Sequence, residues 1–345
     1  MNRRAFLFLI AAAAAAAGFF AYDGGLRAPG LAFAAKLGEP GPHSPHDELA
    51  ALPLQLVFDQ ARGQIISRQE NGEIVSWDLA TGDDALIGQT DSLFGYCPAE
   101  QRLVTSDAGG LVYLDFAQGE IRHLSETHYD HAAWSGDCTR LLLAEDDSHR
   151  VELWDGARLR PLSHAETGEP VRNGLALSDD GRLVAAALGT FNVGKGHETS
   201  LALFEVSEDD ALTPLAVRDD TDMVLGMWTM AFAPDARSLF VGAQIAVYSG
   251  LRSIAPTTGE THWGQDGFRS YWVRAIAVSP AGDLLLSGDE KGMLRAWNAE
   301  TGALLFERET GMVIQSLAFS PDGKSLAIGL KDSTIRIVEL ASLTG

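Results

Sequence analysis

Basic residues are scarce in this sequence. Its 26 Lys and Arg stand against 47 Asp and Glu, so the formal net charge of the 345 residues is −21 at pH 7. A chain this acidic repels nucleic acid and anionic lipid surfaces, because both are bound mainly through Lys and Arg. The composition therefore predicts no nucleic-acid partner, and it leaves open that the acidic surface attracts a basic protein.

Catalytic motifs are absent as well. The sequence has no Gly-x-Ser-x-Gly elbow, and the segment GTFNVGKGHETS (residues 189–200) lacks the residue order of a phosphate-binding loop. Motifs therefore give no support for an enzyme, and we predict no cofactor. An enzymatic alternative stays open, because carboxylates and histidines from distant segments can meet in a site that spacing does not reveal.

The first 34 residues have the features of an export signal. Arg3-Arg4 precedes an Ala-rich apolar run, and Ala32-Phe33-Ala34 provides a small-x-small exit. We expect a twin-arginine signal that is cleaved after Ala34 and directs the chain to the bacterial periplasm. An uncleaved inner-membrane anchor is the alternative, because the run over residues 5–21 reaches the lower limit for spanning a bilayer. The Pro- and Gly-rich residues 35–46 are then expected to form a tether.

The last full repeat, residues 313–340, reveals how the chain is organised. It reads VIQSLAFSPDGKSLAIGLKDSTIRIVEL and holds three runs rich in apolar and β-branched residues, VIQSLAF, SLAIGL and TIRIVEL. Pro321-Asp322-Gly323 and Lys331-Asp332-Ser333 separate these runs, so the pattern predicts three antiparallel strands joined by tight turns. A sheet this small needs neighbours like itself to bury its faces.

Copies of this unit occur along the chain. Each has a hydrophobic anchor just before its first turn, and the seven anchors are Phe58, Tyr96, Trp134, Leu177, Phe232, Val278 and Phe319. The first turn recurs as SPDGK, SDDGR, APDAR and SPAGD, and the exit of the third strand recurs as SWDLATG and AWNAETG. A period near 40 residues with this order of elements resembles the WD-repeat β-propeller family over roughly residues 50–340.

The resemblance implies a ring-shaped fold. We expect an all-β, seven-bladed β-propeller with four antiparallel strands per blade, formed by residues 47–345 as a single domain. The final repeat ends after its third strand, so a strand from the N-terminal side, near Glu48 to Leu52, should complete the seventh blade and close the ring. Trp77, Trp154 and Trp297 occupy the recurring Trp-Asp position and should pack between neighbouring blades.

The cysteines number only two. Cys97 and Cys138 stand beside the first turn of the neighbouring units two and three. In an exported protein they can form a disulfide that links two blades, and two free buried thiols are the alternative.

Two segments invite comparison with metal sites. His128 and His131 flank Tyr129-Asp130 and resemble part of a ligand cluster, but no further ligands have the spacing of a closed zinc site. Asp219-Asp220-Thr221-Asp222 lacks the glycine and the distal Glu of an EF-hand loop. We keep His128 and His131 as a candidate pair and interpret the acidic segment as a solvated loop.

Loops of a propeller blade emerge on opposite faces of the disc in alternation. The first turn and the Thr-Gly turn share one face, whereas the loops between second and third strands share the other with the connections between blades. Three long segments, residues 189–200, 207–223 and 263–272, predict that this second face is elaborated on blades four to six. Loops held by a rigid scaffold often carry function, so we expect a binding site there.

Residues four before each anchor should lie near the mouth of the central channel on the elaborated face. They are Leu54, Ser92, Asp130, Asn173, Trp228, Arg274 and Gln315. In the WD-repeat family this region commonly holds peptide or protein partners. The predicted partner-binding set, which adds residues of the long segments, is Asp130, Asn173, Phe191, Trp228, Trp263, Phe268, Arg269, Tyr271, Trp272, Arg274 and Gln315. Packing of the blade ends is the alternative role for several of its aromatic residues.

These features together predict a function. The chain is expected to be a monomeric, exported propeller that serves as a binding or assembly scaffold for a protein or peptide partner, in contact with a membrane only if the leader remains as an anchor. One alternative is a propeller hydrolase, lactonase or oxidoreductase with its site at the central channel. The other is an accessory or maturation factor for a periplasmic redox enzyme.

Overall fold

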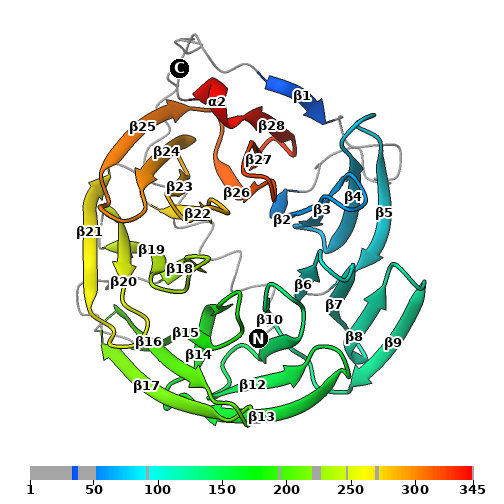
Figure 1. The fold of residues 1–345 in the computed structure, drawn as a ribbon, viewed down its shortest axis with the longest axis vertical. Coiled ribbons are helices and arrows are strands. Elements are labelled where there is room, and N and C mark those ends of the chain that lie inside the picture. Colours follow the sequence, from blue (N-terminus) through cyan, green and yellow to red (C-terminus); the bar gives the residue numbers. More distant parts are fainter. Residues whose placement is uncertain are drawn as a thin grey trace.

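The chain forms seven four-stranded antiparallel sheets that are arranged as blades around a central axis (Figure 1). This computed structural model describes residues 33–37, 52–90, 93–192, 196–219, 227–245, 248–268 and 272–343. Helix within these ranges is limited to the single turn α2 (Leu340–Leu343). The predicted all-β, seven-bladed propeller with four strands per blade is therefore confirmed.

Each blade extends outwards from an inner strand beside the axis. The inner strands are β2 (Pro53–Asp59), β6 (Phe94–Cys97), β10 (His131–Trp134), β14 (Val171–Leu177), β18 (Met227–Phe232), β22 (Val273–Val278) and β26 (Ile314–Phe319). The second strands are β3 (Gln64–Gln69), β7 (Arg102–Asp107), β11 (Arg140–Ala144), β15 (Leu183–Asn192), β19 (Leu239–Ile245), β23 (Leu284–Asp289) and β27 (Ser325–Leu330). The third strands are β4 (Glu73–Asp78), β8 (Gly110–Asp115), β12 (Arg150–Asp155), β16 (Gly196–Val206), β20 (Tyr248–Ile254), β24 (Met293–Asn298) and β28 (Ile335–Glu339). The outer strands are β5 (Asp84–Gln89), β9 (Glu120–Ser125), β13 (Arg160–Glu166), β17 (Leu212–Asp219), β21 (Thr261–Phe268), β25 (Leu304–Glu309) and, for the seventh blade, β1 (Phe33–Leu37).

The recurring first turn has a defined backbone geometry. In blade seven the N–H of Gly323 donates to the carbonyl of Ser320 at 2.8 Å, and Gly323 has a φ of 69°. Gly181 and Gly282 close the first turns of blades four and six in the same way. Glycine ends these turns because it adopts a left-handed backbone without the steric cost that a Cβ atom adds.

A disulfide joins two of these turns. Cys97 follows the anchor of blade two, and Cys138 stands in blade three at the position that Gly323 fills in blade seven. The structure links them with a Cα–Cα distance of 6.0 Å, and both residues are buried. Cys138 has a φ of 59°, so blade three accepts a strained non-glycine residue at a position where the cross-link to blade two requires a thiol.

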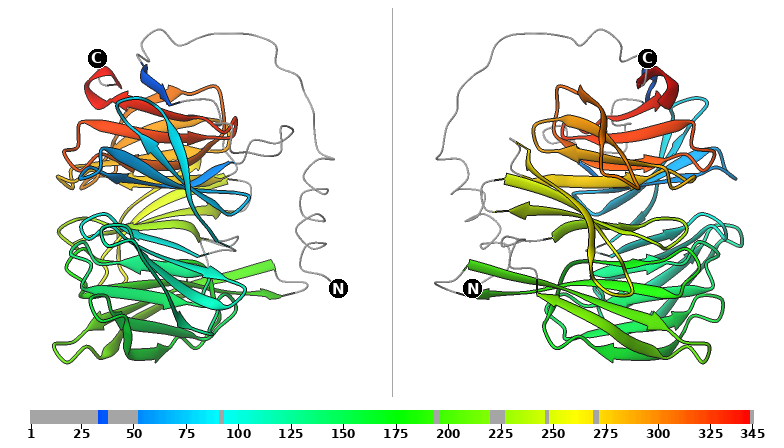
Figure 2. Two further views of the ribbon diagram at one scale, coloured as in Figure 1. Left: turned by 90° about the vertical axis from the view of Figure 1, so that its right-hand side faces the viewer. Right: turned by 60° about the vertical axis from the view of Figure 1, so that its left-hand side comes forward.

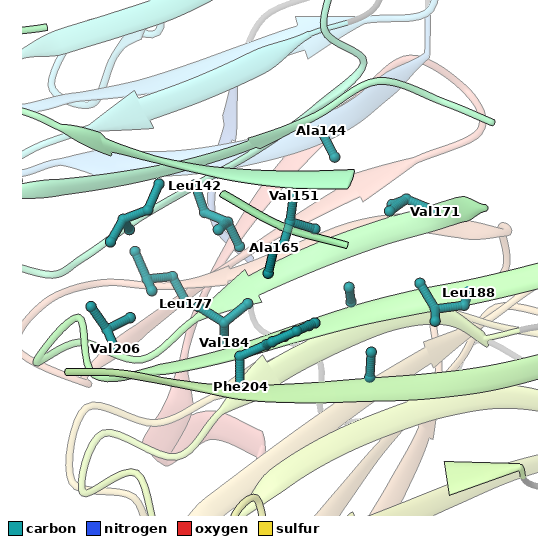
Figure 3. Close-up of a cluster of buried hydrophobic side chains, with 13 residues drawn as sticks. Leu142, Ala144, Val151, Ala165, Val171, Leu177, Val184, Leu188, Phe204 and Val206 are labelled. Carbon is teal, nitrogen blue, oxygen red and sulfur yellow. The ribbon is translucent and has the colours of Figure 1, made fainter. Parts of the chain in front are cut away.

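The hydrophobic core lies between the blades. Seven clusters of buried side chains each combine residues from two adjacent blades. Figure 3 shows the cluster between blades three and four, where Leu142 and Val151 face Val184 and Phe204. Each blade is thus stable only with its neighbours, because neither face of one sheet is covered by the blade itself.

The recurring tryptophans lie in these interfaces, as predicted. Trp77, Trp154 and Trp297 are 4%, 4% and 2% exposed, and each belongs to a cluster shared with the preceding blade. Their indole N–H groups donate to Ser67 Oγ (2.8 Å), Glu152 Oε2 (3.0 Å) and Ser287 Oγ (2.9 Å), respectively. The buried polar atom of each ring is therefore satisfied.

The ring is closed by a strand from the N-terminal side, but not by the predicted one. The outer strand of blade seven is β1, whose Ala35 pairs with Ile337 and whose Leu37 pairs with Ile335. The expectation of residues 48–52 was wrong, because it placed the strand directly before the first anchor and assigned FAAKL to the signal and the tether. Residues 48–51 lie outside the described residues.

Two of the three predicted long loops are largely strands. Residues 207–211 form the turn between β16 and β17, and most of the segment 263–272 belongs to β21. The reason is that both are outer strands, whose exposed sides carry polar residues and so lack a clear apolar alternation. Pro214 lies in β17 beside a shift in register, which an edge strand tolerates because one side of it makes no ladder.

The third long segment is a projecting hairpin. β15 and β16 contain 10 and 11 residues, whereas the other second and third strands contain five to seven. Figure 2 shows these two strands extending beyond the ring on one side. We call this side, which also bears the connections between blades such as residues 126–130, the hairpin face. The opposite side, with the first turns such as residues 320–323, is the turn face.

Candidate functional site

A cavity of about 380 Å³ occupies the central channel. Its wall comes from the inner strands of every blade except the fourth: Leu54, Gln55, Leu56, Val57, Phe94, Gly95, Tyr96, Ala132, Trp134, Thr229, Arg274, Ala275, Ile276, Gln315, Ser316 and Leu317. Leu54, Arg274 and Gln315 lie near the beginnings of their strands, which is the end of the channel on the hairpin face. A volume of this size lies within the range of small-ligand pockets and admits one or two side chains.

Arg274 is the most distinctive group at this mouth. Its guanidinium carbon lies 5.1 Å from the centre of the Trp272 ring, in a cation–π arrangement. Its Nη1 donates to Gln315 Oε1 at 3.4 Å, and its Nη2 lies 3.7 Å from Glu290 Oε2. Both distances exceed those of a strong charge-assisted hydrogen bond, so the guanidinium is positioned without being firmly engaged.

Glu290 belongs to the turn between β23 and β24. Its side chain is 21% exposed, and burial raises the pKa of its carboxyl, while Arg274 opposes that rise and the nearby Asp289 adds to it. Asp289 is itself engaged by Arg295, whose Nη1 lies 2.7 Å from Asp289 Oδ2. Glu290 is therefore the carboxylate that can compete for Arg274 at the mouth.

The predicted ring of residues is only partly assembled at the cavity. Leu54, Arg274 and Gln315 line the cavity. Trp272 does not line it but packs against Arg274. Asp130 does not contribute to the wall, because its Oδ2 accepts the N–H of Asp146 at 2.8 Å within blade three. Asn173 and Trp228 lie on β14 and β18, and their side chains, like Ser92, lie outside the described residues.

The aromatic and basic residues of the long segments are dispersed. Phe191 lies near the end of β15 opposite His197, and Phe268 ends β21. Arg269 and Tyr271 lie outside the described residues. The partner-binding roles of these four residues therefore stay predictions.

Trp263 has a packing role that the sequence interpretation offered only as an alternative. It lies on β21, and its indole N–H donates to the carbonyl of Ala299 at 3.0 Å. Its ring centre is 5.9 Å from that of Phe240, and a Cβ atom at Gly302 would clash with the ring. Trp263 therefore connects blade five to the Thr-Gly turn of blade six, near the turn face.

The two candidate metal-binding histidines engage different carboxylates. His128 Nε2 lies 4.0 Å from Asp130 Oδ1, whereas His131 Nε2 lies 3.3 Å from Asp146 Oδ1. Among the residues that the structure describes, no group of three or more His, Cys, Asp or Glu side chains is placed to hold a metal ion. Likewise, the described part of the chain contains no helix of the length and hydropathy that a membrane span requires.

Part of the wall follows a rule that spacing could have revealed. Five lining residues stand two positions before an anchor, and they are Leu56, Phe94, Ala132, Ile276 and Leu317. Side chains alternate along a strand, so this position faces the channel like the one four before the anchor. Tyr96 and Trp134 line the channel as anchors themselves, which agrees with the same alternation, because an anchor lies two positions further along the strand.

Comparison with known proteins identifies the repeats. Residues 262–298 and 305–339 match the WD40 family model, described as WD domain, G-beta repeat. The first match runs from β21 to β24 and the second from β25 to β28, so each starts in the outer strand of one blade and ends in the third strand of the next. The WD-repeat resemblance of the sequence is confirmed for these segments.

Two of the similar proteins are named as WD-repeat proteins. WD repeat-containing protein SL1-17 of Schistosoma mansoni is 26% identical over 152 residues, which cover 44% of this chain and 48% of that protein. Small ribosomal subunit protein RACK1y of Oryza sativa subsp. japonica is 38% identical over 77 residues, 22% of each chain. WD repeat and HMG-box DNA-binding protein 1 of Xenopus laevis is 22% identical over 299 residues, 82% of this chain and 25% of that protein. The matches thus span about half or less of these relatives. The chain is a seven-bladed β-propeller in which residues 262–298 and 305–339 match the WD40 repeat model.

Proposed function

We propose that this propeller is a scaffold that binds a protein partner on its hairpin face. The observation that carries the proposal is the β15–β16 hairpin, whose strands of 10 and 11 residues extend beyond the ring (Figure 2). The mouth of the central cavity, with Leu54, Arg274 and Gln315, opens on the same side. The long hairpin offers a partner contact area, and the polar groups at the channel mouth beside it offer specific recognition, both held by a rigid ring.

The match of two segments to the WD40 model supports a binding role. WD-repeat propellers commonly act as protein-interaction scaffolds. One relative, RACK1y, is named as a protein of the small ribosomal subunit, which makes it a member of a larger assembly. We propose the same kind of role, that of a propeller within an assembly, for the present chain, but we do not propose the same partner.

Site-specific cross-linking tests the proposed face. A photo-reactive amino acid in place of Phe191, near the end of the hairpin strand β15, should capture the same partner in repeated experiments in living cells. The matched control places the cross-linker at Glu300, an exposed residue of the Thr-Gly turn in blade six on the turn face. We expect a cross-linked product of defined mass from position 191 and none of that mass from position 300.

The reverse pattern would place the partner elsewhere. A product from position 300 alone would move the binding site to the turn face. If the product from position 191 persisted after Arg274→Ala and Trp228→Ala, the partner would use the hairpin without the channel mouth.

We further propose that the chain is exported to the bacterial periplasm through its twin-arginine leader. The disulfide between Cys97 and Cys138 supports this location, because disulfides persist in oxidising compartments. A signal peptidase cut after Ala34 would leave Ala35, Lys36 and Leu37 to pair with β28. The alternative, an uncleaved membrane anchor, keeps β1 whole.

Changing Arg3 and Arg4 to lysine tests export. We expect the double variant to disappear from the periplasmic fraction of a bacterial host and to carry free thiols at Cys97 and Cys138, measured by maleimide labelling. Arg27→Lys is the control, since it keeps the twin pair. N-terminal sequencing of the exported protein then reports whether the leader is removed. Undiminished export of the double variant would contradict a twin-arginine route.

A further inference from the structure

The wall of the central cavity differs in charge from the chain as a whole. The chain has a formal net charge of −21, yet Arg274 is the only residue with a formal charge among the lining residues, all of which belong to the described part of the chain. Tyr96 also lines the cavity, and burial together with its hydrogen bond to Asp59 raises the pKa of its hydroxyl, so it stays neutral. Opposite charges attract strongly in a partly enclosed site, so this wall favours a ligand with one negative charge.

Arg274 has donor capacity that the protein leaves unused. A guanidinium carries five N–H donors, and the bond to Gln315 Oε1 is long at 3.4 Å. The Nε of Arg274 is buried and has no hydrogen-bond partner among the described residues. Within the described part of the chain, its Nη1 and Nη2 make only the long contacts to Gln315 and Glu290, so an acceptor that reached these two groups from the cavity would engage the guanidinium better than the protein does.

Two neighbours prepare the guanidinium for such an acceptor. Trp272 lies 5.1 Å from the guanidinium carbon and restrains the plane of the group, which lowers the entropy lost on binding. Glu290, at 3.7 Å, is too distant for a hydrogen bond and acts as a weak internal competitor. A carboxylate matches the fork of an arginine in shape and charge, so it can displace Glu290.

The rest of the wall is mainly apolar. The apolar residues that line the cavity with Arg274 include Leu54, Leu56, Val57, Phe94, Ile276 and Leu317. A volume of about 380 Å³ exceeds what a carboxylate alone would fill. The geometry therefore fits a carboxylate next to an apolar side chain, a combination that peptides provide.

We propose that the cavity binds a peptide carboxylate flanked by an apolar side chain, with Arg274 as the recognition residue. The inference rests on the proposed function, in that the peptide belongs to the partner bound on the hairpin face. The carboxylate can come from the C-terminus of the partner or from an Asp or Glu side chain, which present the same group to Arg274.

Paired peptides distinguish the two sources. One pair is acetyl-Gly-Gly-Leu with a free C-terminal carboxylate and its C-terminal amide. The other pair is acetyl-Gly-Glu-Leu amide and acetyl-Gly-Gln-Leu amide, and acetate serves as a free small carboxylate. Binding to the purified full chain is followed by calorimetry and by tryptophan fluorescence, because Trp272 contacts Arg274 and Trp134 lines the cavity.

We expect the acid of at least one pair to bind about tenfold more tightly than its neutral counterpart, as one charge-assisted hydrogen bond predicts. Arg274→Gln should abolish that preference. Glu290→Gln should strengthen binding of the acid, because it removes the competing carboxylate while leaving Arg274 in place. Arg172→Gln is the control, since Arg172 pairs with Asp147 and does not line the cavity.

Three results would overturn the inference. Equal binding of acid and neutral peptides to the unaltered protein would show that the cavity does not recognise a carboxylate. The same conclusion would follow if no acid bound to either the unaltered or the Glu290→Gln protein. Acetate binding as tightly as the peptides would assign the site to a free small molecule. Cross-linking from position 191 is independent of these results, so loss of the carboxylate preference with the cross-link retained would leave the scaffold proposal intact.

Discussion

Removing the cross-link between blades two and three is expected to lower the free energy of unfolding by about 4 kcal/mol. The disulfide joins residues separated by 41 positions, and the chain-entropy model gives about 4 kcal/mol for closing a loop of that length in the unfolded chain. The variant that tests this is Cys97→Ala with Cys138→Gly. Glycine is chosen because residue 138 has a φ of 59°, where it relieves about 1 kcal/mol of backbone strain.

The strain relief reduces the expected net loss to about 3 kcal/mol. The measurement is the midpoint of urea-induced unfolding, followed by tryptophan fluorescence with and without a reducing agent. Reduction should lower the midpoint of the unaltered protein and leave that of the double variant unchanged. Cys97→Ala with Cys138→Ala should be less stable than the glycine form. Equal midpoints for the unaltered, oxidised protein and the double variant would mean that the cross-link contributes no more to stability than the strain that glycine relieves at residue 138.

Much of the fold could be predicted because the same constraint recurs in each blade. Trp77, Trp154 and Trp297 are buried between blades, and the turn that ends in Gly323 needs a left-handed residue, so both features recur at fixed places in the sequence. Inner and third strands are covered on both sides by neighbouring blades, which keeps them apolar. Seven repeats therefore identify seven blades.

The outer strands could not be predicted equally well. β17 and β21 were interpreted as connectors because an outer strand has one solvated edge and tolerates charge and proline, as Pro214 illustrates. β1 was missed for another reason. Its sequence, FAAKL, begins within the small-residue exit of the leader, so the export pattern and the strand overlap, and only pairing with the distant β28 reveals the strand.

The candidate site was predictable where it depends on strand register and not where it depends on contacts between blades. Arg274 and Gln315 come from the inner strands of blades six and seven, and their common distance from the anchors placed both at the channel mouth. Glu290 reaches the same mouth from the turn between β23 and β24, which no spacing relates to Arg274. Trp263 was predicted to be an exposed binding residue because it lies in a long segment, whereas the structure packs it against blade six.

Shortening β1 from its N-terminal end is expected to destabilise the ring in steps. β1 pairs with β28 at four positions, between Phe33 and Val338 at one end and between Leu37 and Ile335 at the other. At about 1 kcal/mol for each paired position, loss of the strand should cost on the order of 4 kcal/mol. Its loss also exposes the edge of β28, which favours pairing between molecules.

Three chains that differ only in their first residue measure this effect. They begin at residues 33, 35 and 38, so that all lack the twin arginines and the apolar run of the leader, and they retain four, three and none of the paired positions, respectively. We expect the urea midpoint to fall slightly from the first to the second and sharply from the second to the third. The shortest chain should also self-associate in sedimentation experiments. The closing role of β1 would be contradicted if the chains beginning at residues 33 and 38 unfolded at the same urea concentration and remained monomeric, because blade seven would then be stable with three strands.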